Sequence, residues 1–360
     1  MPATIGVRGK WHRRHEKRPP DLSADARHYR KISTTKLLNL LNLLNLQDSD
    51  NGRKRGNPVT RSQPNWRSLL FVPVLAERFV SKAHLRGADA IILDLEDSII
   101  PANKAAARAA VAAAVPRVAQ SGAQGAGADV VVRINRPLEL AVPDIAASVM
   151  PGVAALMIPK VMGPEHVRLL AELVADREAA LGMAAGHTRF LALIETPAAL
   201  PHLFAIAAEP RMAGMSVGGE DMATDLGAIP SADSMYVFAM QGLAACRAAG
   251  ILPMGSMGQL AKIDDLDSYR AGLQRGKALG FTTAACIHPA HVPIINEEYG
   301  ASDAELDRAR RLLVAFEAAV AAGEGAVAFE GSMIDLPVVI RAQRLLARAA
   351  SWTKAGGDQR

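Results

Sequence analysis

Short runs of apolar residues alternate with longer, alanine-rich stretches along the chain after residue 66. An apolar run of four to eight residues bounded by glycine or polar residues is typical of a buried strand, whereas the longer stretches are typical of helices. The alternation predicts eight strand–helix units within about 235 residues. The predicted strands are Ser68–Val74, Ala90–Leu95, Asp129–Ile134, Ala155–Pro159, Phe190–Ile194, Met212–Val217, Leu252–Met254 and Thr282–Ile287.

Helices are predicted between successive strands. Strands that are buried on both faces and joined by helical crossovers form a parallel sheet. Eight such units in this length predict a (β/α)8 TIM barrel. A doubly wound open sheet is the alternative, but no Gly-x-Gly-x-x-Gly follows the first strand. The predicted helices are Glu77–Arg86, Lys104–Val115, a poorly defined Ala141–Met150, Pro164–Leu181, Pro201–Ala208, Met235–Ala249, Asp265–Leu279 and His291–Glu298.

The pattern divides the chain into four parts. Residues 1–65 are predicted to be a basic, disordered extension, and residues 66–300 the barrel and catalytic domain. Residues 301–350 are predicted to form a C-terminal helical and lid extension, with helices at Asp303–Ala322 and Pro337–Arg348 around a loop at Phe329–Asp335. Residues 351–360 are predicted to be a disordered tail.

The first 64 residues differ from the rest of the chain in charge. The net charge of +5 conceals fourteen Lys/Arg and five Asp/Glu in residues 1–64, which leaves a net charge of −4 on the remainder. With aromatic residues at 4%, this mildly acidic body is not expected to bind nucleic acid, and a tail-driven role is a distant alternative. Cys246 and Cys286 lie in apolar segments and predict buried thiols in a reducing compartment. No apolar run approaches the roughly 18 residues of a membrane span, and a cytoplasmic protein is expected.

Polar or ionisable residues follow six of the predicted strands. The active site of a barrel lies at this C-terminal edge. Carboxylates there supply the oxygen ligands that Mg²⁺ prefers, and an arginine beside them supplies a fixed cation. The pattern therefore predicts Mg²⁺-dependent chemistry in which an enolate is stabilised. The residues are Glu96, Asp97, Arg133, Asn135, Lys160, Glu195, Glu220, Asp221 and His288.

Several of these residues also fit simpler roles. Glu220 and Asp221 fit an acidic pair in the first turn of a helix. Lys160 fits either a Schiff-base lysine or a lysine paired with carboxylates. His288 fits a structural residue at a strand–helix junction as well as a general base. The chain contains no His-Glu-x-x-His zinc motif.

A series of motifs then follows in a recognisable order. Over about residues 66–350 the chain resembles the citrate lyase beta-subunit-like and malyl-CoA lyase branch of the HpcH/HpaI aldolase superfamily. The motifs that carry the resemblance are Arg67–Pro73, Gly87–Ser98, Val132–Asn135, Ile158–Lys160, Leu193–Thr196, Gly219–Asp221, Cys286–Pro289 and Gly331–Asp335.

The resemblance implies a role for each matching residue. Glu195 and Asp221 resemble the Mg²⁺ ligands, and Glu195 also lies at the substrate. Arg133 resembles the arginine that binds substrate and steadies the enolate oxygen of the thioester. Asp335 resembles the acid/base on a C-terminal lid that reaches the active site of a neighbouring subunit, although an exposed loop acid or helix N-cap also fits it. Three further residues match positions that would hold these groups in place, namely Glu96, Asp97 and Lys160.

The implied reaction is reversible Claisen- or aldol-type cleavage of a carbon–carbon bond. A 3-hydroxy-acyl-CoA such as malyl-CoA or citramalyl-CoA would give an acyl-CoA and a 2-oxo acid or glyoxylate. A lid that serves a neighbouring site implies a homo-oligomer, either a trimer or a hexamer.

Two departures from the family pattern lie near the expected substrate entrance. Relatives commonly carry Gly-Asp-Arg-Pro-Glu-Arg-Phe after the first strand, where this chain has Pro73–Phe79 without that first arginine. They carry Ala-Arg-Gly after the metal-binding glutamate, where this chain has Pro197–Ala199. Two alternatives therefore stay open: a Mg²⁺-dependent aldolase acting on free 4-hydroxy-2-oxo acids, and a non-catalytic subunit of the citrate lyase kind.

Overall fold

The structure is a computed structural model that describes residues 63–119, 127–257 and 264–355. The extension predicted for residues 1–65 lies almost wholly outside the described residues. Asn65 is described, and its side-chain amide donates to the carbonyl of Arg348, 2.9 Å away. No helix within the described ranges is long and apolar enough to cross a membrane.

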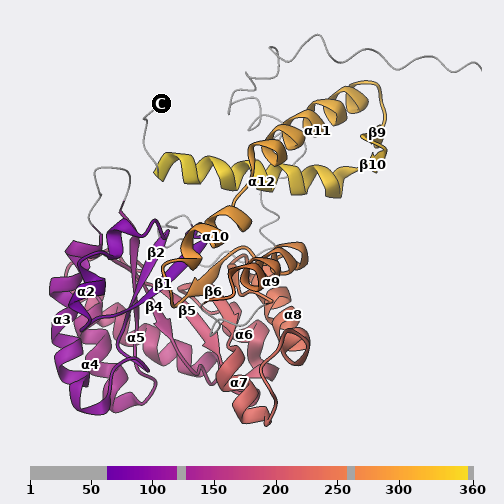
Figure 1. Ribbon diagram of the computed structural model, residues 1–360. Helices are drawn as coiled ribbons and strands as arrows, with labels where there is room; N and C mark the ends of the chain where they lie inside the picture. The colour runs from indigo at the N-terminus through magenta and orange to yellow at the C-terminus, as the bar shows by residue number, and fades with distance from the viewer. Residues whose placement is uncertain (1–62, 120–126, 258–263, 356–360) are drawn as a thin grey trace, which may run out of the picture. The chain divides into compact units, whose positions relative to one another are not determined.

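Eight parallel strands form one sheet that curls into a nearly closed ring, as the sequence predicts (Figure 1). The order around the ring is β7-β6-β5-β4-β3-β2-β1-β8. The ring closes between β7 and β8 through one isolated bridge, Met254 to Thr283. The fold is therefore a (β/α)8 barrel. The strands are β1 (Ser68–Pro73), β2 (Ala90–Asp94), β3 (Asp129–Arg133), β4 (Val153–Ile158), β5 (Arg189–Ile194), β6 (Met212–Val217), β7 (Leu252–Met254) and β8 (Ala284–Cys286).

Alternating strand residues fill two separate cores. One set packs inside the ring, and it includes Leu69, Ile92, Val131 and Leu191. The residues between them pack outward against the helices, including Leu70, Ile91, Val130 and Phe190. Successive side chains on a strand point to opposite faces, so strands enclosed on both faces need an almost continuous apolar sequence.

Helices surround the strands and mostly match the predicted ones. Two predictions were wrong in part. The helix predicted at Glu77–Arg86 breaks after Val80, where the Ser81 hydroxyl donates to the Glu77 carbonyl at 2.8 Å. The helix predicted at Pro201–Ala208 begins only after Pro201, which lacks an N–H. The helices are α2 (Glu77–Val80), α3 (Lys104–Val118), α4 (Leu138–Ser148), α5 (Pro164–Ala180), α6 (Leu203–Ala207), α7 (Gly219–Leu226), α8 (Ala232–Ala249), α9 (Leu266–Leu279) and α10 (His291–Glu298), with 3₁₀ turns η3 (Ala83–Leu85), η4 (Pro101–Asn103) and η5 (Pro197–His202).

The C-terminal extension is a helical pair with a hairpin between its members. Helices α11 (Asp303–Ala321) and α12 (Leu336–Ala355) run side by side in orange and yellow in Figure 1. The loop predicted at Phe329–Asp335 is instead an antiparallel hairpin of β9 (Val327–Phe329) and β10 (Ser332–Ile334). Helix α12 also continues past its predicted end at Arg348 and into the predicted tail.

Candidate active site

Strand alternation carries three charged side chains to the inner C-terminal rim of the barrel. Asp94 follows Ile92 by two residues, Arg133 follows Val131 by two, and Glu195 follows Leu193 by two. A spacing of two keeps a side chain on the same face of a strand, which here is the interior of the ring. Charged groups therefore replace the apolar layer where β2, β3 and β5 reach the mouth.

Arg133 is fixed by a bidentate pair with Asp94. The two residues are Cα partners in the β2–β3 register. Arg133 Nε lies 2.7 Å from Asp94 Oδ1, and Nη2 lies 2.8 Å from Oδ2. The Glu96 amide donates to the same carboxylate at 2.9 Å. Burial would raise the pKa of Asp94, but the Arg133 bonds outweigh it and lower that pKa, so Asp94 is ionised.

The free edge of the Arg133 guanidinium faces two more carboxylates. Nη1 lies 2.9 Å from Glu96 Oε2, in an ion pair without hydrogen-bond alignment, and 3.3 Å from Asp97 Oδ2. The guanidinium also stands over the Phe71 ring, 4.8 Å from its centroid. Burial opposes the charge of Arg133, but these carboxylates and Asp94 raise its pKa and keep it a permanent cation.

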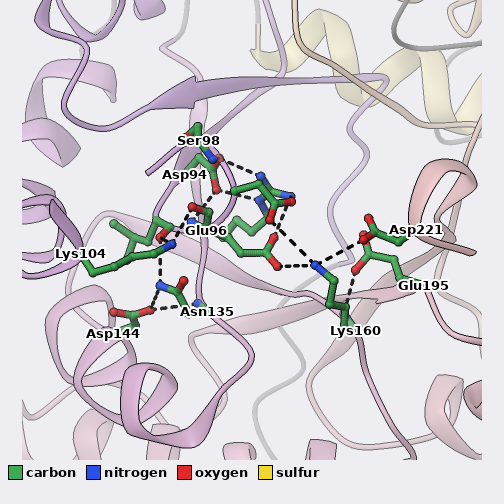
Figure 2. A network of polar contacts seen from close by, with 12 residues as sticks. Asp94, Glu96, Ser98, Lys104, Asn135, Asp144, Lys160, Glu195 and Asp221 are labelled. Atoms are coloured by element: carbon green, nitrogen blue, oxygen red, sulfur yellow. Dashed lines mark hydrogen bonds and ion pairs between the residues drawn. The ribbon is translucent and has the colours of Figure 1, made fainter. Parts of the chain in front are cut away.

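Lys160 joins the ends of four strands. Its φ of 47° is left-handed, a conformation that non-glycine residues adopt rarely and mostly under constraint. In this conformation its main-chain N–H donates to Glu195 Oε2 at 2.8 Å. Its ammonium lies 3.0 Å from Glu96 Oε1 and 3.5 Å from Asp221 Oδ1 (Figure 2).

The charge state of Lys160 follows from these partners. Burial would lower the pKa of Lys160, but the hydrogen bond that its ammonium donates to Glu96, with the charges of Glu96, Asp97 and Asp221, outweighs burial and raises that pKa. An ammonium held protonated in this way is not a nucleophile, which favours the charge-paired lysine over the Schiff base.

Glu195 is the least compensated acid of the group. It is 6% exposed, and the described residues offer its side chain one hydrogen bond, from the Lys160 N–H. Burial, with the neighbouring charges of Glu96 and Asp221, raises the pKa of Glu195 to about 7. Gly218 lies directly against it, since a Cβ at 218 would stand 2.5 Å from Glu195 Cγ. Only glycine leaves room for this carboxylate.

Asp221 lies in the first turn of α7, a helix that was not among the predicted elements. Asp221 therefore has both of the roles considered for it: an acid at a helix N-terminus and a member of the charged cluster. Its side chain is 45% exposed and faces the Lys160 ammonium.

A second layer of polar groups supports the turn after β2 (Figure 2). The Lys104 ammonium donates to the carbonyls of Leu95 and Glu96, at 2.8 and 2.7 Å. Asn135 Nδ2 donates to the Leu95 carbonyl at 2.9 Å and to Asp144 Oδ2 at 2.6 Å. These bonds tie α3, α4 and the β3 end to the backbone that presents Glu96.

The charge balance of the cluster leaves room for a divalent cation. Two cations, Arg133 and Lys160, face a larger set of carboxylates. No group of three or more His, Cys, Asp or Glu in the described part of the chain could hold a metal by itself. Mg²⁺ commonly binds to one or two carboxylates and completes its octahedron with water and substrate. The residues therefore fit Mg²⁺ better than a metal that needs a closed protein cage. The carboxylates are Asp94, Glu96, Asp97, Glu195 and Asp221.

Of the seven residues to which the resemblance assigns a role, six come together in this cluster and Asp335 does not. Asp335 is exposed after β10, where its carbonyl accepts the N–H groups of Val338 and Val339 at the start of α12. His288 lies at the junction after β8, and its Nδ1 accepts the Ala290 N–H at 3.3 Å, as a structural residue would. Asp94 was not predicted as the partner of Arg133, although its spacing of two from Ile92 places both side chains on the same face of β2.

Fold and site together define the class: a barrel enzyme with a polar, charge-rich C-terminal mouth. The model of the HpcH/HpaI aldolase/citrate lyase family matches residues 67–289. The citrate lyase subunit beta of Leuconostoc mesenteroides subsp. cremoris is 31% identical over 79% of this chain and 93% of that protein. An L-malyl-CoA/beta-methylmalyl-CoA lyase of Cereibacter sphaeroides is 31% identical over 82% of this chain and 98% of that protein.

A solved structure is also similar to this chain. It is the protein CitE from Mycobacterium tuberculosis in complex with magnesium, acetoacetate and coenzyme A, with a TM-score of 0.62 and 30% identity over 79% of this chain and 97% of that one. The chain belongs to the HpcH/HpaI aldolase/citrate lyase family, and it is a carbon–carbon lyase of the citrate lyase beta-subunit-like kind.

Proposed function

We propose that the protein is a Mg²⁺-dependent lyase that cleaves a 3-hydroxy-acyl-CoA of the malyl or citramalyl type to an acyl-CoA and a 2-oxo acid or glyoxylate. The observation that carries the proposal is the convergence of Glu195, Asp221 and Lys160 beside the Arg133–Asp94 pair. Relatives named for malyl-CoA cleavage and a neighbour crystallised with magnesium and coenzyme A support it.

Glu195 and Asp221 are the proposed metal ligands. Glu195 directly follows β5, Asp221 lies in the first turn of α7, and both contact Lys160. Mg²⁺ bound there would act as a Lewis acid toward the carbonyl and carboxylate of a 2-oxo acid. The proposed ligands would be held in place by Lys160, together with Glu96 and Asp97. The Lys160 N–H orients Glu195, and the Lys160 ammonium lies between the carboxylates of Glu96 and Asp221.

Arg133 is the proposed cation for the enolate oxygen. Its guanidinium is held on one edge by Asp94 and keeps its charge at all working pH values. A fixed donor of this kind stabilises negative charge without reorganising as the bond breaks. Asp335 is the proposed acid/base, and it would move the proton between the hydroxyl and the enolate carbon from the lid of a neighbouring subunit in a homo-oligomer.

A panel assay with purified protein and Mg²⁺ tests the proposal. Malyl-CoA, citramalyl-CoA and the matching free hydroxy acids are the substrates, and release of glyoxylate or pyruvate is followed. Cleavage of a thioester that is lost in Asp221→Ala supports the lyase and its metal site together. Release of free CoA without a 2-oxo acid would indicate hydrolysis instead and contradict the proposal.

The free-acid aldolase is a second candidate because of one local difference. The segment after Glu195 is the 3₁₀ turn η5 and contains Pro197 and Pro201. The arginine and glycine that relatives carry there are absent. Turnover of 4-hydroxy-2-oxo acids, with no turnover of any thioester, would favour this reaction. No turnover of either class would favour the non-catalytic subunit.

A further inference from the structure

Four arginines gather at the N-terminal end of the barrel, opposite the active-site mouth. Arg67 immediately precedes β1, Arg247 lies in the last turn of α8, and Arg344 and Arg348 lie one turn apart on α12. We call these four residues the arginine cluster. Residues four apart on a helix share a face, so Arg344 and Arg348 lie on the same side of α12.

Contacts hold three of the guanidiniums around one small region. Arg67 and Arg348 both stand over the Trp352 ring, 4.9 and 5.1 Å from its centroid. Arg348 Nη2 donates to the Thr282 carbonyl at 3.2 Å, and Arg247 Nη2 donates to the Gly280 carbonyl at 2.6 Å. These two carbonyls belong to the turn that follows the C-terminus of α9, where cations are favoured.

Among the described residues, negative charge does not balance the cluster, because Asp89 is the carboxylate that pairs with it, through Arg67 at 2.8 Å. Asp129 lies nearby but accepts the indole N–H of Trp66. Arg348 is half-buried, and its oxygen partners are the neutral Asn65 side chain and the Thr282 carbonyl.

The pKa values of Arg348 and Arg247 are lowered, in agreement with repulsion between these cations. Burial, with the charges of Arg247 and Arg67, lowers the pKa of Arg348 to about 10. Burial and the charge of Arg344 lower the pKa of Arg247. The mutual repulsion of these positive charges opposes the docking of α12 on the barrel.

We propose that the arginine cluster binds a small phosphate-type oxyanion, which bridges α12 to the N-terminal end of the barrel. Guanidinium forks match the oxygens of a phosphate, and Arg247 and Arg348 are already oriented by the carbonyls of the turn after α9. The site is separate from the proposed lyase site and does not depend on its activity.

The test compares melting temperatures in phosphate and in chloride at matched ionic strength, with the full chain. Saturating phosphate is expected to raise the melting temperature of the wild-type protein by about 2 to 4 °C along a saturable curve. Arg344→Glu introduces an anion beside Arg247 and Arg348. It is expected to raise the melting temperature in chloride and to abolish the response to phosphate.

Arg136→Glu is the matched control, because Arg136 is exposed just after β3, at the opposite end of the barrel. It is expected to keep the wild-type response to phosphate. A response that survives in Arg344→Glu, or one that disappears in Arg136→Glu, would place the phosphate elsewhere and overturn the proposal. So would a wild-type protein that shows no saturable response.

Discussion

Replacing Gly218 by alanine would disturb the proposed metal site through one contact. An alanine Cβ would lie 2.5 Å from Glu195 Cγ and 3.3 Å from Glu195 Oε1. Carbon atoms in ordinary contact are about 3.5 to 4.0 Å apart, so Glu195 or the Gly218 backbone must move by about 1 Å. Gly218 has φ −73° and ψ 128°, which alanine adopts freely. Backbone strain therefore adds nothing to the effect.

The magnitude follows from that displacement. Overpacking a well-filled site costs about 1 to 3 kcal/mol of unfolding free energy. A catalytic group misplaced by about 1 Å costs on the order of 100-fold in rate. We expect Gly218→Ala to lower kcat/KM by that order and to weaken Mg²⁺ binding, measured by steady-state kinetics and isothermal titration calorimetry.

Gly219 provides the matched control. A Cβ at Gly219 would meet no heavy atom within 4 Å, and the residue begins α7. Gly219→Ala should therefore keep wild-type kinetics and Mg²⁺ affinity, with equal or slightly higher stability. If Gly218→Ala behaves like Gly219→Ala in both assays, the reasoning about Glu195 is refuted.

Three further predictions address the rest of the site. Arg133→Lys keeps a cation but loses the bidentate pair with Asp94, and kcat should fall by about 100-fold or more while the melting temperature falls, as kinetics and calorimetry would show. Since the pKa of Glu195 is raised to about 7 by burial, Glu96 and Asp221, the metal-free site gains a proton as the pH falls through that value. Mg²⁺ affinity should therefore drop below about pH 7, with proton release on binding that is detectable in buffers of different ionisation enthalpy; an affinity independent of pH from 6 to 8 would contradict this. If Asp335 serves a neighbouring subunit, mixing inactive Asp335→Asn and Asp221→Ala proteins should restore up to about a quarter of wild-type kcat, and no recovery after subunit exchange would count against it.

The barrel and its polar mouth could be predicted because their signals are local. Each strand is an apolar run, and the observed strand ends agree with the predicted ones to within two residues. The β9–β10 hairpin was missed because its strands have three residues each and, unlike β7, are mostly not buried. Its two-residue turn, Glu330 and Gly331, has positive φ at both positions, which suits a tight hairpin. An Asn-Gly dipeptide predicts such a turn much more strongly than the Glu-Gly dipeptide found here.

The pairing of charges within the site could not be predicted in the same way. Arg133 pairs with Asp94, rather than with Glu96 or Asp97 alone, because the β2–β3 register sets Asp94 opposite it. The register between two parallel strands depends on the whole crossover that connects them, so it cannot be predicted from the sequence of either strand. The left-handed turn at Lys160, which lets one residue contact Glu195 and Asp221, likewise exists only when the strands are assembled.

The incomplete closure of the ring has a consequence for how the molecule fluctuates. Strands β7 and β8 have three residues each and meet through one bridge, Met254 to Thr283. Opening a ladder is easiest where the fewest hydrogen bonds must break, so the ring should part first at this seam. In the strand order, the pair opposite the seam is β3 and β4, which carry Arg133 and position Lys160. The barrel can therefore open locally between β7 and β8 while β3 and β4, on the opposite side, stay paired and keep the charged cluster in place.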